Sequence, residues 1–123
     1  AGKTKHDGES LKKLLTDESR LIFVAADEND RVLGYIFCII IDHSADSARC
    51  PNTELYIDDL CVDENFRREG IGDALFQKAL STAQKLGCHN LTLNVWEGND
   101  SALRFYEKHS MKIQKRELEI VLD

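Results

Sequence analysis

The sequence predicts a single domain of the mixed α/β class. Its 123 residues, of which 42% are hydrophobic, are enough to build one buried core. Segments with the apolar spacing of helices alternate with segments of strand-like composition, which is typical of a layered α/β structure. The chain contains no repeat, low-complexity tract or interior linker, so we expect residues 1–123 to form one domain.

The first third is expected to contain a short helix followed by a β-hairpin. In ESLKKLLTD (9–17), the three leucines lie on one side of a helix. In RLIFVAADENDRVLGYIFCIIID (20–42), two β-rich runs flank the turn signal DENDR, which is typical of a hairpin. The polar stretch HSADSARCPN (43–52) contains the only proline and is expected to be an exposed loop.

The remaining residues are expected to alternate between strands and helices. A broad apolar stripe predicts one long helix, which Gly87 would end as a C-terminal cap. Asn99 or Asp100 could cap the start of a second helix. The expected elements are a strand over 54–62, a helix over 71–86, a strand over 90–96, a helix that includes 102–106 and a last strand over 112–122.

Charge and composition narrow the classes of function. The net charge of −6 repels nucleic acid and suits a cationic partner, although mild acidity is also ordinary for a soluble domain. No apolar stretch is long enough to span a bilayer, and residues 1–10 lack the apolar core of a secretory signal, so we expect a cytoplasmic protein without a membrane segment. The four cysteines and four histidines have no metal-ligand spacing, so no metal is expected.

The stretch FRREGIGDAL (66–75) places two arginines and two glycines immediately before the long helix. Free backbone N–H groups and the positive end of the helix dipole favour phosphate oxygens at this position. Leu75 excludes a dinucleotide fingerprint, and no Lys-Ser/Thr pair follows for a P-loop. The stretch therefore indicates a pyrophosphate site, with a tight strand-to-helix turn that binds nothing as the alternative.

RREGIG (67–72) resembles the Gln/Arg-x-x-Gly-x-Gly/Ala signature of the GCN5-related N-acetyltransferases. YIDDLCVDENF (56–66) is similar to that family's fourth strand and its exit. LTLNVWEGNDSALRFYEKHSM (91–111) is similar to the fifth strand and the helix after it. The resemblance runs from about residue 21 to the C-terminus and implies a mainly antiparallel sheet with one splayed pair of parallel strands, flanked by helices.

The resemblance also implies acetyl-CoA as co-substrate. Its pantetheine arm would pair with the strand near Leu60, and its pyrophosphate would lie on the glycine turn. The implied cofactor-binding residues are Leu60, Cys61, Val62, Arg67, Arg68, Gly70, Ile71, Gly72, Asp73 and Asn99. Asn99 could equally be a plain helix cap.

For catalysis, the family's tyrosine that protonates the departing thiolate corresponds to Tyr106, seven residues after Asn99. Without the resemblance, Tyr106 would be interpreted as a packing residue. Asn94 stands where related enzymes have a glutamate base. Polyamine acetyltransferases have an acidic pair in the fourth strand, so we choose Asp58 of the pair Asp58–Asp59 as the base, with a solvent-facing or capping carboxylate as the alternative.

Several further expectations follow. Glu54 and Tyr56 could contact the acceptor, whereas Cys61 is interpreted as a buried packing residue, which favours direct transfer. Compared with the family, an N-terminal strand and helix are expected to be missing. The expected acceptor is a small cationic amine of the polyamine or amino-sugar kind. A protein N-terminus or lysine, a non-catalytic acyl-CoA-binding module and a structural domain remain alternatives, and an exposed last strand could pair across a homodimer.

Overall fold

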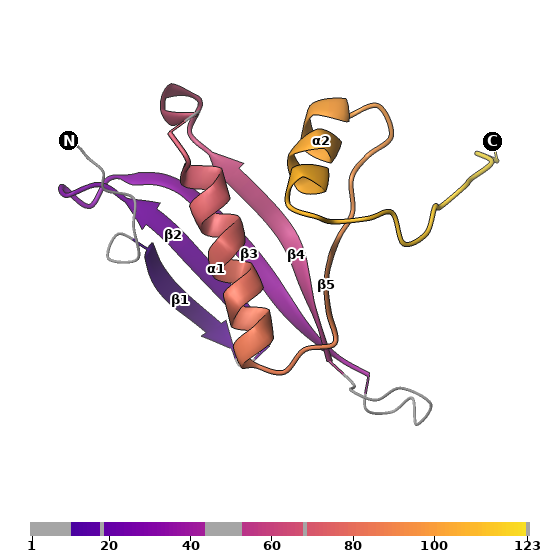
Figure 1. Ribbon diagram of the computed structural model, residues 1–123, viewed down its shortest axis with the longest axis horizontal. Coiled ribbons are helices and arrows are strands. Elements are labelled where there is room, and N and C mark those ends of the chain that lie inside the picture. The colour runs from indigo at the N-terminus through magenta and orange to yellow at the C-terminus, as the bar shows by residue number, and fades with distance from the viewer. Residues whose placement is uncertain (1–10, 18, 44–52, 68, 123) are drawn as a thin grey trace.

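A computed structural model describes residues 11–17, 19–43, 53–67 and 69–122. One five-stranded sheet, in the order β1-β2-β3-β4-β5, is crossed on one face by the helix α1 (Figure 1). The pairs β1–β2, β2–β3 and β3–β4 are antiparallel, and the pair β4–β5 is parallel. The strands are β1 (Leu11–Asp17), β2 (Arg20–Ala26), β3 (Val32–Asp42), β4 (Thr53–Val62) and β5 (Asn90–Leu93). The predicted sheet type is therefore confirmed.

The predicted hairpin is formed by β2 and β3. In its turn, the Asp27 carboxylate accepts hydrogen bonds from the backbone N–H groups of Asn29 and Arg31, both at 2.9 Å. Asp30 adopts the left-handed conformation at φ 63°, which aspartate tolerates better than most residues. The turn chemistry in the sequence thus explains the register of the two strands. The loop expected over 43–52 lies, apart from His43, outside the described residues.

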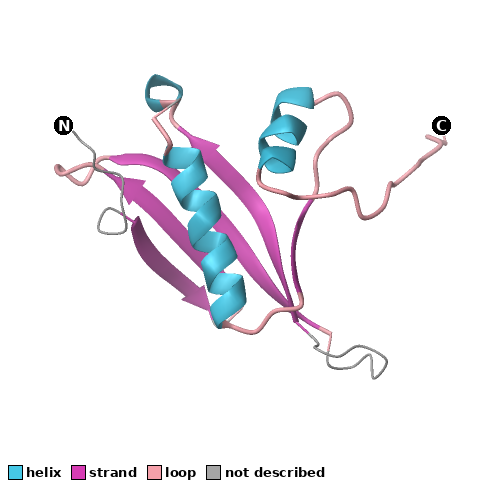
Figure 2. Cartoon of the chain, viewed as in Figure 1, coloured by secondary structure: helices cyan, strands magenta, loops and turns pink. Residues whose placement is uncertain are grey.

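The helix α1 (Ile71–Lys85) buries its apolar stripe against β2, β3 and β4 (Figure 2). Leu86 and then Gly87, at φ 73°, end the helix, as the sequence predicted for the glycine. The second helix, α2 (Asp100–Lys108), begins after the cap Asn99, whose side chain accepts a hydrogen bond from the Ala102 N–H. Fully buried core side chains include Leu33, Ile36, Leu55, Ile71, Leu75 and Phe76.

Two predicted elements are wrong. Residues 11–17 form the strand β1, paired along β2, and not a helix. A segment this short gains little as an isolated helix, whereas the free edge of β2 offers a complete ladder of hydrogen bonds. The tail over 112–122 forms no strand, and Leu118 and Ile120 are 91% and 86% exposed. No helix in the described part of the chain is long and apolar enough to cross a membrane.

The core contains one titratable group with a pH-dependent effect on stability. Burial raises the pKa of the Cys38 thiol from 9.0 to about 12. Because the folded state then holds the proton more tightly than the unfolded state, this contribution is complete below about pH 9 and is lost as pH rises toward 12. In that window one such group lowers the free energy of unfolding by up to about 1.4 kcal/mol per pH unit. Thermal denaturation followed by circular dichroism should show a shallower alkaline decline for Cys38→Ala; an identical slope would contradict the assignment.

Candidate active site

The parallel strands β4 and β5 separate before β4 ends. Their pairing stops at Ile57 and Leu93, while β4 continues to Val62 beside β3 (Figure 1). A β-bulge lies at the point of separation, because Cys38 pairs with Ile57 and Phe37 with Asp59, which leaves Asp58 without a partner in β3. Among the described strands, the β5-facing edge of residues 58–62 therefore has no ladder partner, so an extended ligand could pair with this backbone.

The N-terminus of α1 lies near Val62, the last residue of β4, and has no side-chain cap. Its N-cap residue, Gly70, adopts the left-handed conformation at φ 79°, and apart from its chain neighbours no described residue has an atom within 4 Å of the position that a Cβ would occupy. The first-turn N–H groups therefore have no side-chain cap and lie at the positive end of the helix dipole. This geometry suits an anion such as a pyrophosphate.

The residues predicted to contact the phosphate differ in which of their groups a phosphate could reach. Arg67 is exposed and donates through Nε to the Val62 carbonyl at 3.4 Å, whereas Arg68 lies outside the described residues. Ile71 is a core residue with 1% exposure, so only its backbone could meet a phosphate. At Gly72 an added Cβ would lie 3.5 Å from the Phe105 ring, which is ordinary contact.

Asp73, also predicted to bind the cofactor, connects α1 to α2. Its Oδ1 lies 2.7 Å from His109 Nε2 and 3.7 Å from Lys108 Nζ. His109 caps the C-terminus of α2, where positive charge is favourable, and its ring stacks on Phe76 with the centroids 4.4 Å apart. The Asp73–His109 contact thereby links α2, which carries Tyr106, to the first turn of α1.

Tyr106 is half-buried on α2. Its ring packs against Phe105 and Phe76, with centroids 5.1 Å and 6.1 Å away. Burial raises the pKa of the phenol above 10.0, and the negative charge of Asp59 raises it further. The hydroxyl is therefore protonated at neutral pH and can act as a proton donor.

The two adjacent carboxylates are both exposed because of the bulge. Asp59 accepts a hydrogen bond of 2.7 Å from the Tyr35 hydroxyl, which raises the pKa of Tyr35 to about 12. Asp58 is the bulged residue itself. Asp58 and Asp59 thus lie where β4 and β5 separate. The charge of Asp59 also raises the pKa of Tyr106.

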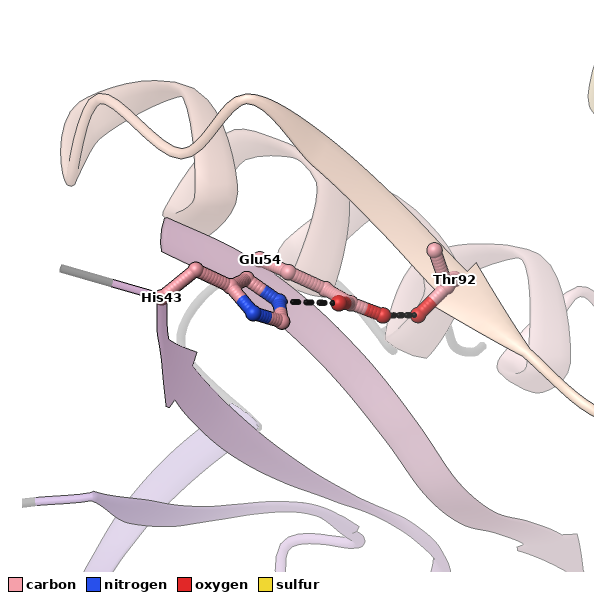
Figure 3. Close-up of polar contacts among 3 residues, drawn as sticks. All are labelled: His43, Glu54 and Thr92. Carbon is pink, nitrogen blue, oxygen red and sulfur yellow. Dashed lines mark hydrogen bonds and ion pairs between the residues drawn. The ribbon is translucent and has the colours of Figure 1, made fainter. Parts of the chain in front are cut away.

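A second polar group lies on the same strand, nearer its start. His43 Nε2 is 2.8 Å from Glu54 Oε1, and the Thr92 hydroxyl donates to Glu54 Oε2 (Figure 3). Next along the sheet, Asn94 Nδ2 donates to the Tyr56 hydroxyl at 3.1 Å. Strand alternation explains the grouping, since Leu55 and Ile57 point to the core and Glu54 and Tyr56 to the face opposite α1.

Sequence reasoning missed three contributors: Tyr35, His43 and His109. Each comes from a segment remote from its partner, and only the sheet register or the helix packing brings them together. Cys61 was interpreted as buried, but it is exposed. After the bulge the alternation is shifted by one residue, which directs Leu60 and Val62 to the core and Cys61 outward.

Comparison with known proteins gives consistent matches. The family model described as the acetyltransferase (GNAT) family matches residues 2–111. The chain is 33% identical over 92 residues to a Bacillus subtilis protein provisionally named phosphinothricin acetyltransferase YwnH, covering 75% of this chain and 53% of that protein. It is 31% identical over 86 residues to N-alpha-acetyltransferase 30 of Schizosaccharomyces pombe, covering 70% and 53%. The chain thus spans about half the length of these relatives.

Solved structures share the fold. The crystal structure of an aminoglycoside acetyltransferase from an uncultured soil metagenomic sample, in complex with trehalose, superimposes with a TM-score of 0.72 at 25% identity. The match covers 89% of this chain and 70% of that chain. The sheet with its separated parallel strands is therefore an arrangement found in experimental structures.

Proposed function

This chain belongs to the acetyltransferase (GNAT) family, and from that premise we propose that it transfers an acetyl group from acetyl-CoA to the primary amine of a small cationic acceptor. One observation carries the proposal. The β5-facing edge of residues 58–62 has no partner among the described strands, the start of α1 has no side-chain cap and lies near Val62, and the protonated Tyr106 lies on α2, whose Phe105 is near the same start of α1. Transfer from acetyl-CoA requires three such features: a backbone edge that pairs with the pantetheine arm, a site that binds the pyrophosphate and an acid that protonates the departing CoA thiolate.

Backbone groups of the protein would bind both the pantetheine arm and the pyrophosphate of acetyl-CoA. The pantetheine arm would pair with the edge of Leu60, Cys61 and Val62 as an added strand does. The pyrophosphate would accept hydrogen bonds from the first-turn N–H groups of α1 beside Arg67. The Asn99 side chain already caps α2. Asn99 would therefore contact the pantetheine arm through its backbone, or through a side chain that bonds to the arm and to α2 at the same time.

The chemistry follows from these positions. A neutral amine attacks the thioester carbonyl, and the carbon–sulfur bond breaks as the tetrahedral intermediate collapses. A backbone N–H near Leu60 would stabilise the oxyanion. Asp58 would accept the amine's proton, either directly or through water, and the Tyr106 hydroxyl would protonate the departing CoA thiolate. Each turnover thus consumes one proton at Tyr106 and releases one at the base.

The choice of acceptor rests on charge. Asp58 and Asp59 are both exposed at the separation of the strands, and the chain carries a net charge of −6. Two carboxylates beside the reacting centre attract an ammonium-bearing acceptor. The second candidate, a protein N-terminus, is favoured by the likeness to N-alpha-acetyltransferase 30; a non-catalytic acyl-CoA module is the third. A screen of small amines against acceptor peptides, read out as free CoA thiol, separates the three.

The donor site is tested by Arg67→Glu. Reversing this charge should weaken acetyl-CoA binding by about 10- to 100-fold, since a charge-assisted hydrogen bond contributes about 1.5–3 kcal/mol. The single tryptophan, Trp96, is 88% exposed and follows β5, so its fluorescence is a convenient second signal beside calorimetry. Arg116→Glu makes the same charge change on the exposed tail and should leave the affinity unchanged. If Arg67→Glu and Arg116→Glu bound acetyl-CoA with equal affinity, the assignment of the pyrophosphate site to the start of α1 would be wrong.

A further inference from the structure

The contact between Asp73 and His109 joins the two helices that the proposed transfer uses. Asp73 lies in the first turn of α1, where we place the pyrophosphate of acetyl-CoA, and His109 caps the C-terminus of α2, which carries Tyr106. We propose that His109, through its hydrogen bond to Asp73, is a positioning residue that fixes the Tyr106 hydroxyl relative to the bound donor. This inference rests on the proposed function, which it deepens by naming what holds the acid in place.

Helical spacing places the contacting residues on one face of each helix. Asp73 and Phe76 are three positions apart in α1, and Tyr106 and His109 are three positions apart in α2. Residues with this spacing are neighbours on the surface of a helix. The Phe76 ring contacts both residues of α2, with its centroid 4.4 Å from that of His109 and 6.1 Å from that of Tyr106. A displacement of His109 would therefore displace the tyrosine as well.

Ring packing alone would allow α2 to shift along α1. Among the described residues, the two helices make polar contacts with each other only at Asp73, whose Oδ1 lies 2.7 Å from His109 Nε2 and 3.7 Å from Lys108 Nζ. Aromatic rings attract each other over a broad range of offsets and tilts, whereas a hydrogen bond to a carboxylate has a narrow range of length. The His109 side chain is 17% exposed and that of Lys108 is 65% exposed. Solvent therefore screens the histidine contact less, and His109 supplies the constraint.

The position of the hydroxyl determines how well it can protonate the sulfur. A proton donor has to lie within hydrogen-bond reach of the atom that it protonates. A misplacement of about 1 Å can lower a rate by about 10²-fold. Binding of acetyl-CoA would use backbone groups of β4 and α1, which remain in place when the contact between the helices is lost. The expected signature is therefore a lower kcat at a nearly unchanged acetyl-CoA affinity.

Two substitutions of His109 separate the hydrogen bond from the packing. His109→Phe keeps a ring against Phe76 and loses the donor to Asp73, whereas His109→Gln keeps an N–H donor and loses the ring. With the amine that gives the highest turnover in the screen, kcat should fall at least about tenfold in His109→Phe and stay within about threefold of wild type in His109→Gln. Calorimetry should give acetyl-CoA affinities within about threefold of wild type for both. Packing alone predicts the opposite order of kcat, and that order would overturn the inference.

Two substitutions of Asp73 give a readout that does not depend on turnover. Asp73→Asn keeps an oxygen that can accept from His109, whereas Asp73→Ala removes it. In protein with isotope-labelled tyrosine, the NMR signal of the Tyr106 ring, assigned with Tyr106→Phe, reports its position because nearby aromatic rings shift it. This signal should move in Asp73→Ala and stay in Asp73→Asn. The signals of Tyr35 and Tyr56 should stay in both.

A control and a double variant complete the design, each compared at a temperature at which its circular dichroism spectrum matches wild type. Lys108→Gln removes the other cation beside Asp73 and should leave kcat within about twofold of wild type. In Asp73→Ala combined with His109→Phe, kcat should fall no further than in the lower single variant, because both break one contact.

An unmoved Tyr106 signal in Asp73→Ala, or losses of kcat that multiply in the double variant, would overturn the inference. Failure of the proposed function has a different signature. Wild type would then release no CoA thiol with any amine, while the Tyr106 signal would still show whether Asp73 and His109 hold the tyrosine in place.

Discussion

Replacing Tyr106 by phenylalanine is expected to lower kcat by about 10²- to 10⁴-fold while leaving acetyl-CoA affinity within about twofold of wild type. The phenyl ring keeps the packing against Phe76 and Phe105, so the change removes only the hydroxyl that would protonate the thiolate. Release of free CoA thiol measures kcat, and calorimetry measures the affinity. A lower kcat with an unchanged acetyl-CoA affinity is the result expected for a residue that donates its proton only in the transition state.

The pH profile gives an independent check on the same residue. Because burial and then the charge of Asp59 raise the pKa of Tyr106, any fall in kcat caused by loss of its proton should occur above pH 10. Tyr56→Phe also removes a hydroxyl, the one that accepts from Asn94, and should change kcat for a simple monoamine little. If Tyr106→Phe retained wild-type turnover, solvent or another group would have to protonate the thiolate.

Replacing Phe76 by alanine is expected to lower the free energy of unfolding by about 3–5 kcal/mol, the usual cost of removing a buried aromatic ring. Phe76 is 1% exposed and lies between the sheet and α2, where His109 stacks on it and Phe105 meets it edge-on. The cavity would therefore weaken both the core and the attachment of α2. Urea denaturation measures the loss.

A second phenylalanine-to-alanine change, at Phe66, tests whether the loss of stability depends on the buried position of Phe76. Phe66 precedes the glycine turn, is only half-buried and lies beneath the Arg31 guanidinium, 5.1 Å from its ring centroid. Phe66→Ala should therefore cost less than Phe76→Ala. In Phe76→Ala kcat should also fall in the fraction that remains folded, because Tyr106 loses its support. A loss of stability below about 1 kcal/mol would show that α2 is held by other contacts.

The fold was predictable where local chemistry and tertiary packing agree. Turn residues and the apolar stripe located the β2–β3 hairpin and α1 closely. Residues 11–17 and 112–122 were predicted wrongly for a common reason. A strand depends on an available edge, and a local pattern contains no information about that edge. The leucines of 11–17 satisfied the helical pattern, yet the segment pairs with β2. The tail alternates, yet it pairs with none of the described strands.

The site was predictable only in part. The glycine turn and the N-cap Asn99 follow from short-range chemistry, and the structure has both. Contacts such as Tyr35 with Asp59 and His43 with Glu54 join residues that are 24 and 11 positions apart. They arise from strand register, which depends on the bulge at Asp58, and adjacent aspartates alone do not reveal a bulge.

That bulge also determines which length changes β4 can tolerate. Deleting Asp58 would join Ile57 directly to Asp59 and give a regular ladder against β3, with every other side chain kept on its present face. Deleting a residue elsewhere in the middle of the strand would turn Leu55 and Ile57, or Leu60 and Val62, to the opposite side of the sheet. A chain shortened by Asp58 should therefore still fold around the same core, with a straighter strand, a narrower separation from β5 and one carboxylate fewer to receive an amine.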